Sequence, residues 1–406
     1  MNQNNATLLF TSRYWHLAIL ALSGFVTSFG AHIVATNLPA YAEVVGVGAF
    51  TIGLLIAVYD FAELFAKPMA GFVADKRGMR GTLIAGLFIF IFGSLLFLAI
   101  NPRLLLLVRF VQGLGAAALS TVSITLVAQY FSEGRGKAFG IYNAIKGGGY
   151  VIAPAFGGFL VHGYGFTAIF VVSAGVGVLA LVLSLFLPRD QQKAQDLKND
   201  EDDEITLKQF FLILKEPRLL PVYAVIVINM FMVGILFGFL PVYLYSIGYT
   251  PLESGTVVSV GTLSYLLVQP FAGYLADKVE IQTTVLAGLL LSSLAIILTT
   301  FTSDVALIAV VILAGLGIGT VWTNSDALVS TLVDKSRLGT GMGAAQSFKE
   351  FGDMTGPLLI GLVTQFYGVH VGFVMCGLLA LIFLFVLARS RLSGHAIRHY
   401  DARPSN

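Results

Sequence analysis

A short charged segment occurs twice in this chain, and the two copies lie half a chain length apart. The first copy begins at Gly71 (GFVADKRG) and the second at Gly273 (GYLADK), 202 residues later in a chain of 406. Each copy directly follows a long apolar stretch. A repeat of this kind is typical of duplicated membrane proteins, whose halves flank a site near the middle of the bilayer.

The composition agrees with a membrane location for most of the chain. Hydrophobic residues make up 57% of the sequence and charged residues 11%, against about 25% charged residues in soluble domains. A bilayer core about 30 Å thick needs about 20 mostly apolar residues per helix. Windows of that length predict twelve segments: 15–38, 49–73, 82–100, 104–128, 138–161, 166–187, 220–244, 254–275, 283–301, 305–329, 341–366 and 370–388.

These segments predict an all-α membrane protein with twelve transmembrane helices in two six-helix bundles related by the repeat. Alternation at barrel spacing is missing from the sequence, so helices must satisfy the backbone in lipid. We expect the bundles at 1–187 and 218–390, a cytoplasmic linker at 188–217 and a cytoplasmic tail at 391–406. The first helix is expected to be retained, because no small-residue cleavage site follows it. Cys376 is the sole cysteine, so an intrachain disulfide is excluded.

The distribution of lysine and arginine predicts the orientation. With the N-terminus inside, the basic residues of the inner segments are Arg13, Lys76, Arg77, Arg80, Arg135, Lys137, those from Arg189 to Arg218, Lys278, Lys335, Arg337 and those from Arg389 to Arg403. The outer segments then contain Arg103 alone. This asymmetry predicts a multi-pass protein of the cell membrane with both termini cytoplasmic. In the linker, the acidic run 200–204 reads as a solvated face, and 206–214 as an amphipathic surface helix.

The repeat extends over five pairs of helices. At a spacing of 202, Leu38-Pro39 and Tyr41 match Leu240-Pro241 and Tyr243, and Gly113-Leu114-Gly115 matches Gly315-Leu316-Gly317. At 203, the residues Gly140, Lys146, Gly149, Pro154 and Gly158 match Gly343, Lys349, Gly352, Pro357 and Gly361. The second set places a lysine inside the membrane in both copies.

Charged residues inside the apolar segments are the candidates for proton coupling. An ionised group at mid-membrane costs about 2.5–3.5 kcal/mol and normally faces a cavity or a partner. Asp60, Glu63 and Lys67 fall on one stripe of the second helix about 60° wide, and Lys349, Glu350 and Asp353 form a similar stripe on the eleventh. Further charges are Arg109, Lys146 and Asp326. The alternative is a permanent buried network that only fixes the packing.

Three motifs make the chain resemble the major facilitator superfamily over essentially its whole length. Between helices two and three, the family signature is met by Gly71, Ala74, Asp75, Lys76 and Gly78, with Val73 and Met79 as departures. In helix four, Leu105, Arg109, Gln112, Gly113, Gly115, Ala116 and Ala117 are similar to a second motif. In helix five, Gly140, Gly149, Pro154, Gly157 and Gly158 are similar to the antiporter motif, although Ala153 stands where glycine is usual.

The resemblance implies a role for each motif. It implies a cytoplasmic gate in which Asp75, near Arg135, latches the two halves, and the degenerate second copy at Asp277 contributes less. It also implies that helices two and eleven lie side by side, so that ion pairs between their stripes break and form during transport. The alternatives from the residues themselves are a turn that only directs insertion, and a helix five whose glycines and proline only permit a tight crossing.

From the charges and the resemblance together we expect a secondary transporter and not an enzyme. The favoured function is proton-coupled efflux of a small organic compound by alternating access. The alternative is proton-coupled uptake of a charged metabolite, and a non-transporting receptor is the least favoured. Expected partners are the substrate, protons and the lipid bilayer. We expect a monomer. No metal-ligand spacing, nucleophile–base arrangement or phosphate-binding loop is visible in the sequence, so we expect no cofactor, metal site or nucleic-acid partner.

Overall fold

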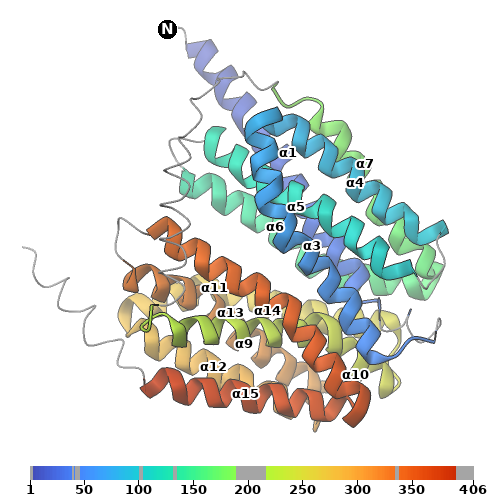
Figure 1. Ribbon diagram of the computed structural model, residues 1–406, viewed down its shortest axis with the longest axis vertical. Helices are drawn as coiled ribbons and strands as arrows, with labels where there is room; N and C mark the ends of the chain where they lie inside the picture. Colours follow the sequence, from blue (N-terminus) through green and yellow to red (C-terminus); the bar gives the residue numbers. More distant parts are fainter. Residues whose placement is uncertain are drawn as a thin grey trace, which may run out of the picture. The chain divides into compact units, whose positions relative to one another are not determined.

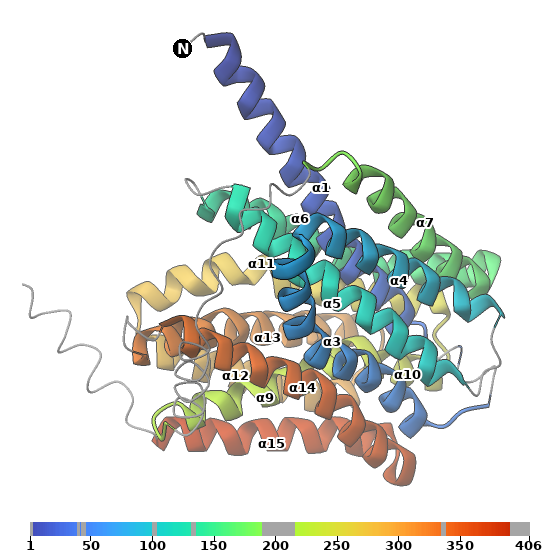
Figure 2. The same ribbon diagram turned by 45° about the horizontal axis from the view of Figure 1, so that its top comes forward.

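The computed structural model describes residues 3–38, 41, 46–99, 104–130, 135–188, 216–333 and 338–389. The predicted amphipathic helix 206–214, most of the linker and the tail lie outside these residues. The elements of the described ranges, drawn in Figures 1 and 2, are α1 (Gln3–Ala35), α3 (Ala49–Arg77), α4 (Met79–Ala99), α5 (Leu105–Tyr130), α6 (Arg135–Tyr164), α7 (Phe166–Ser184), α9 (Leu220–Gly234), η2 (Ile235–Phe239), α10 (Leu240–Ser246), α11 (Pro251–Lys278), α12 (Ile281–Thr299), α13 (Asp304–Leu332), α14 (Leu338–Tyr367) and α15 (Val369–Arg389).

The helical fold is confirmed, with two differences at helix boundaries. In the described part of the chain, eleven helical stretches are long and apolar enough to cross a membrane. The remaining predicted segment, 341–366, corresponds to α14, which has 30 residues but carries Lys349, Glu350 and Asp353 near its middle. Helix α1 begins at Gln3 rather than near residue 15. The apolar window therefore located the membrane-spanning part of α1 but not its polar N-terminal turns.

The chain divides into two compact units. Unit 1 comprises Met1–Lys193 together with Leu244–Ser259, and unit 2 comprises Ala194–Tyr243 and Val260–Asn406. The start of α11 therefore belongs to unit 1 and the rest of that helix to unit 2.

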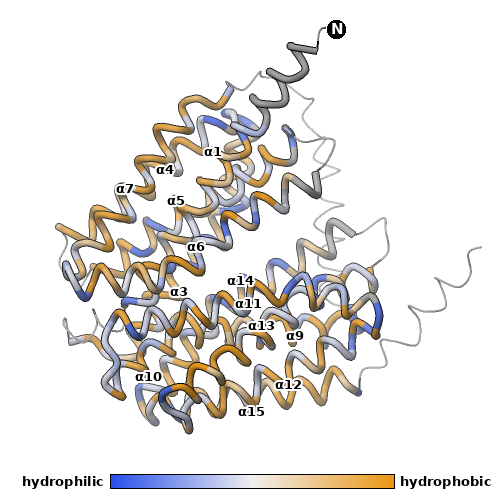
Figure 3. Tube along the Cα trace, turned by 180° about the vertical axis from the view of Figure 1, so that it is seen from behind, coloured by the Kyte–Doolittle hydropathy of each residue, from blue (hydrophilic) through white to orange (hydrophobic). Residues whose placement is uncertain are grey.

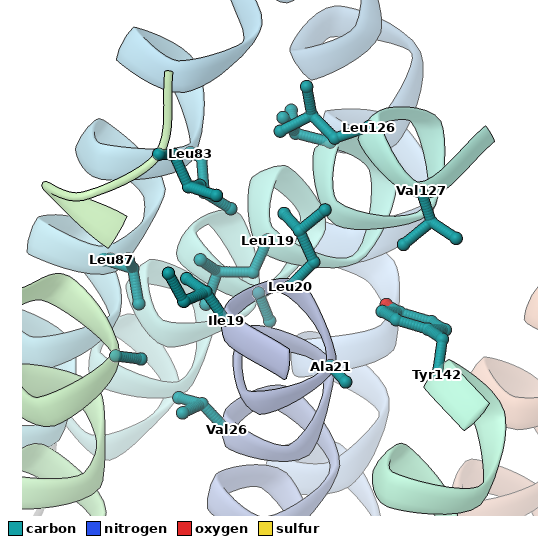
Figure 4. Close-up of a cluster of buried hydrophobic side chains, with 14 of the residues drawn as sticks. Ile19, Leu20, Ala21, Val26, Leu83, Leu87, Leu119, Leu126, Val127 and Tyr142 are labelled. Atoms are coloured by element: carbon teal, nitrogen blue, oxygen red, sulfur yellow. The ribbon is translucent and has the colours of Figure 1, made fainter. Parts of the chain in front are cut away.

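In unit 1 the central helix is α1, which packs against α5, α6 and α7. Leu20, Leu87 and Leu119 from α1, α4 and α5 are fully buried in one apolar cluster, shown in Figure 4. Helix α9 has the same place in unit 2, where it packs against α12, α13, α14 and α15. Figure 3 shows that α4, α7, α12 and α15 are mainly apolar along their length. Their exposed phenylalanines, including Phe88, Phe92 and Phe385, suit a lipid-facing surface.

The sequence repeat reappears as equivalent contacts within each unit. A Cβ built on Gly71 would lie 3.9 Å from Thr121 Cγ2, and one built on Gly273 would lie 3.9 Å from Thr323 Cγ2. The four residues obey the spacing of 202. A Cβ at either position would be in ordinary van der Waals contact, so α3 meets α5 at the same separation at which α11 meets α13. Each unit therefore packs its repeated helices in the same way.

The repeated Leu-Pro pair coincides with an irregular helix in both units. Helix α1 ends at Ala35, and the Asn37 amide Nδ2 donates to the Ile33 carbonyl at 2.8 Å. In unit 2 the corresponding stretch is the π-helix η2, where the Leu240 N–H donates to the Ile235 carbonyl. Proline cannot donate to the preceding turn, so the chain before it must find other hydrogen bonds. The two units satisfy this requirement differently.

Candidate functional site

Arg109 on α5 is the most buried charged residue described in unit 1, with 1% of its surface exposed. Its Nε donates to the Leu55 carbonyl on α3 at 3.0 Å, and its Nη1 donates to Gln112 Oε1 at 2.8 Å. The guanidinium lies 4.4 Å from the centre of the Tyr59 ring. Planar geometry and several fixed donors suit arginine to such a site, because one side chain satisfies groups on two helices. The arrangement fixes α5 against α3.

A chain of polar side chains continues from Arg109 into the bundle. Gln112 Nε2 donates to Ser94 Oγ on α4 at 3.1 Å, and Ser94 Oγ lies 3.3 Å from Ser173 Oγ on α7. All three side chains are buried. Buried polar groups in an apolar surrounding require such partners. The chain thus links α5, α4 and α7 at the level of Arg109.

Two of the three charged residues predicted on one stripe of α3 form an ion pair with each other. Glu63 Oε2 lies 2.6 Å from Lys67 Nζ, and both side chains are largely buried. Asp60 and Glu63 are within electrostatic range of Arg109. Tyr59 interacts electrostatically with Asp60, Glu63 and Arg109. The sequence contains no signal that Tyr59 belongs to this group. The structure therefore places Asp60 and Glu63 within electrostatic range of both Arg109 and Tyr59.

Helices α1 and α6 complete this cluster in unit 1. His32 interacts electrostatically with Arg109 and Lys146. Its Nδ1 donates to the Ser28 carbonyl at 2.8 Å, and its ring meets the Tyr150 ring edge-on at 4.5 Å between centres. These contacts support the packing role that a lone histidine usually has. The Lys146 side chain is in the membrane-spanning part of α6 and is partly buried, whereas its counterpart Lys349 is buried.

In unit 2 the corresponding lysine, Lys349 on α14, has a partner on α13. Its Nζ lies 2.6 Å from Asp326 Oδ2 and 4.5 Å from the centre of the Trp322 ring. The Trp322 ring meets the Tyr265 ring of α11 at 5.7 Å. Glu350 and Asp353, predicted on the same stripe as Lys349, are partly buried. The lysine thus pairs with a neighbouring helix of its own unit, which the stripe alone did not predict.

The glycines of the antiporter-like helix α6 differ in their surroundings. A Cβ on Gly149 would lie 2.8 Å from Phe29 N, and one on Gly157 would lie 2.8 Å from Ile33 Cγ1, so both permit close packing on α1. A Cβ on Gly158 would lie 2.9 Å from the Pro251 carbonyl carbon in the same unit. Gly140 has nothing within 4 Å of such a Cβ. Close packing therefore concerns Gly149, Gly157 and Gly158, the three glycines for which it was expected, and not Gly140.

At Pro154 a serine of α11 enters the hydrogen-bond ladder of α6. The Ala155 N–H donates to Ser259 Oγ at 2.9 Å, and Ser259 Oγ donates to the Val151 carbonyl at 2.6 Å. The hydroxyl therefore bridges a donor and an acceptor that pair directly in a regular helix. Pro154 explains the opening of the ladder, because proline interrupts a helix at this point. The proline is evident from the sequence, but the serine lies 104 residues from Ala155 and carries no local signal.

For the predicted gate, the structure describes the backbone and the Lys76 side chain. The side chains of Asp75, Arg135 and Asp277 lie outside the described set. Gly78 ends α3 with φ of 98°, a conformation that favours glycine, and its N–H donates to the Ala74 carbonyl. Lys76 and Lys278 lie over Phe72 and Tyr274, at 4.2 and 4.5 Å from the ring centres. The turn geometry at Gly78 agrees with the motif, and the latch stays a prediction.

Metal binding finds no support in the described residues, where no group of three or more His, Cys, Asp and Glu side chains could hold an ion. The sole cysteine, Cys376, is fully buried. The polar side chains described in the spanning helices include charged pairs, hydroxyls, amides and a histidine. Such groups can bind a proton or an organic molecule.

Comparison with known proteins identifies relatives of the same length. The chain is 23% identical to multidrug resistance protein 2 of Bacillus subtilis (strain 168), over 90% of this chain and 92% of the relative. It is 26% identical to the multi-drug resistance efflux pump PmrA of Streptococcus pneumoniae serotype 4 (strain ATCC BAA-334 / TIGR4), over 88% of this chain and 91% of the pump.

Solved structures show the same fold. The crystal structure of a bacterial homologue of the human lysosomal transporter Spinster superposes with a TM-score of 0.78 at 17% identity, covering 94% of this chain and 98% of that one. A D-xylose-proton symporter superposes with a TM-score of 0.75 at 13% identity, covering 94% and 99%. The family model described as Major Facilitator Superfamily matches residues 20–264 and 222–401. The chain therefore belongs to the Major Facilitator Superfamily and is a membrane transporter, not an enzyme.

Proposed function

We propose that this protein exports a small organic compound across the cell membrane in exchange for protons, by alternating access of its two units. Export is supported by the relatives that are named for multidrug resistance and efflux. Proton coupling is supported by one observation above all. The Glu63 carboxylate is inside the spanning helix α3, 2.6 Å from the Lys67 ammonium and within electrostatic range of buried Arg109.

The chemistry of this arrangement suits a reversible proton site. A carboxylate in a low-dielectric surrounding binds a proton more readily, whereas a neighbouring cation favours the ionised form. Because the two residues are on the same helix, a rotation of the Lys67 side chain away from Glu63 promotes proton binding, and its return promotes release. Asp60 lies one turn away and offers a second carboxylate for the same process.

The test is transport in proteoliposomes, with organic compounds screened for substrate-dependent proton movement by a pH-sensitive dye. Glu63→Gln should abolish uphill transport driven by a proton gradient and preserve exchange of substrate down its own gradient. Glu280→Gln is the matched control, because Glu280 is exposed at the start of α12. Uphill transport that survives both Glu63→Gln and Asp60→Asn would overturn this assignment and direct attention to Asp326, Glu350 and Asp353.

The alternative, proton-coupled uptake of a charged metabolite, is favoured by the amount of charge in unit 1. The number of charged side chains there is larger than the binding of an apolar compound requires. They are Asp60, Glu63, Lys67, Arg109 and Lys146. The direction of movement separates the two functions. Under an inwardly directed proton gradient, an exporter lowers the substrate content of right-side-out vesicles, whereas an uptake symporter raises it.

A further inference from the structure

Lys349, Asp326 and Trp322 form a compact charged and aromatic cluster in unit 2. The Lys349 ammonium lies 2.6 Å from a carboxylate oxygen of Asp326 and 4.5 Å from the centre of the Trp322 ring. Tyr265 lies edge-on beside the indole. A carboxylate beside aromatic rings is the usual composition of a receptor for an organic cation, because the ring face and the anion both attract positive charge. In this receptor the bound cation is the chain's own lysine.

The two charged partners differ in accessibility. The Lys349 side chain is 4% exposed, whereas that of Asp326 is 31% exposed. A molecule arriving at the cluster therefore meets the carboxylate before it meets the ammonium. This order favours a cationic ligand over an anionic one, since an anion would approach the exposed negative charge.

Comparison of the two repeats indicates that the cluster is not a by-product of the duplicated packing. Lys349 corresponds to Lys146, but Asp326, Trp322 and Tyr265 correspond to Ile124, Ser120 and Glu63 in the first half. The shared helix arrangement thus forms without this acid and without these rings. A buried ion pair is also weak as a stabilising device, because its desolvation offsets most of the attraction. The combination found in unit 2 therefore calls for a ligand-binding explanation.

We propose that Asp326, Trp322 and Tyr265 form a binding site for an aromatic organic cation, and that the Lys349 side chain competes with that cation for the site. The inference rests on the proposed function, because it assigns the substrate class. An incoming cation displaces the lysine from Asp326 and covers the Trp322 ring in its place. A small inorganic cation covers little of the Trp322 ring, so it replaces less of the contact that the displaced lysine gives up. The lysine therefore makes the site selective for cations that carry a large aromatic body.

Competition by the Lys349 side chain lowers the affinity of the site for its ligand by an amount that can be measured. When the lysine occupies the carboxylate for nine-tenths of the time, the apparent affinity of the ligand falls about tenfold. Removal of the ammonium should therefore strengthen binding. A purely structural ion pair predicts the opposite, because loss of one partner disturbs the site.

The chain offers a direct reporter for the experiment. It contains two tryptophans, Trp15 and Trp322, so Trp15→Phe leaves Trp322 as the sole tryptophan. Binding of tetraphenylphosphonium to the full-length protein in detergent is followed by Trp322 fluorescence at pH 8.5. We expect Lys349→Met to bind this cation about tenfold more tightly, and Asp326→Asn to bind it at least tenfold more weakly. Tetraphenylborate, an anion of matched shape, should not gain affinity from Lys349→Met.

Two further variants keep the result interpretable. Lys349→Arg keeps the competing charge and should bind the cation like the parent protein. The double variant Asp326→Asn/Lys349→Met removes both charges and should bind cation and anion alike. Thermal unfolding of each variant reports whether the bundle is intact. Weaker or unchanged cation binding in an intact Lys349→Met protein overturns the proposal, as does full binding in Asp326→Asn. Equilibrium binding needs no proton gradient, so this outcome is independent of the Glu63 transport test.

Discussion

The buried Arg109 contacts groups on two helices of unit 1. Its guanidinium joins the Leu55 carbonyl, the Gln112 amide and the Tyr59 ring. Arg109→Lys keeps the charge but cannot present two donors in a fixed plane, so at least one buried acceptor loses its partner. An unsatisfied buried group costs about 1–3 kcal/mol.

We therefore expect Arg109→Lys to lower the midpoint of thermal unfolding in detergent and to impair proton-driven transport. Arg218→Lys is the control, because Arg218 is exposed just before α9 and should tolerate the change. An unchanged unfolding midpoint in Arg109→Lys would show that the network around Gln112 is dispensable for stability.

At the scale of helices, the glycines at helix contacts make a sharper test than those in open positions. A Cβ on Gly113 of α5 would lie 2.6 Å from the Tyr59 carbonyl oxygen and 2.9 Å from Ala62 Cβ. Gly113→Ala must therefore push α5 away from α3, and we expect a lower unfolding midpoint. Gly81→Ala in α4 meets nothing within 4 Å and should be neutral or stabilising by up to about 1 kcal/mol. Equal effects of the two changes in the unfolding assay would contradict this assignment of the α3–α5 contact.

The sequence predicts helices and repeats well, but it predicts side-chain partners poorly. The spacing of 202 foretold that Gly71 and Gly273 have equivalent surroundings, because glycine positions determine which helices can approach. The pairing of Lys349 with Asp326 was not foretold, because the acid is on another helix and lacks a counterpart in the first half. Ser259 escaped prediction for the same reason. Helical periodicity predicts which residues share one face of a helix. Only the packed structure shows which residues of other helices contact that face.

At the scale of the whole molecule, the two copies of the charged turn should differ in importance. If Asp75 latches the halves, Asp75→Asn should abolish transport while insertion and substrate binding persist. Asp277→Asn should do less damage, because the motif around it is degenerate. Transport assays with both variants check this expectation, and equal losses would indicate that the turns only direct insertion.

The orientation of the chain can be tested with introduced cysteines. The sole natural cysteine is buried, so Cys376→Ser provides a clean background with little change to the surface. A cysteine in the 190–204 linker should react with an impermeant thiol reagent only from the cytoplasmic side. One at the exposed start of α11, near Glu253, should react from outside. The reverse labelling pattern would invert the proposed topology.

Helix α14 has a consequence for how the protein is made. Its Lys349, Glu350 and Asp353 together penalise entry into lipid by several kcal/mol, since each central Lys or Asp costs about 2.5–3.5 kcal/mol on insertion scales. Helix α13 precedes it, is strongly apolar, and supplies Asp326 to neutralise the lysine. We therefore expect α13 to stay beside the insertion channel until α14 has been made, so that Asp326 and Lys349 enter the lipid as a pair. These two helices would then enter the bilayer together rather than one at a time.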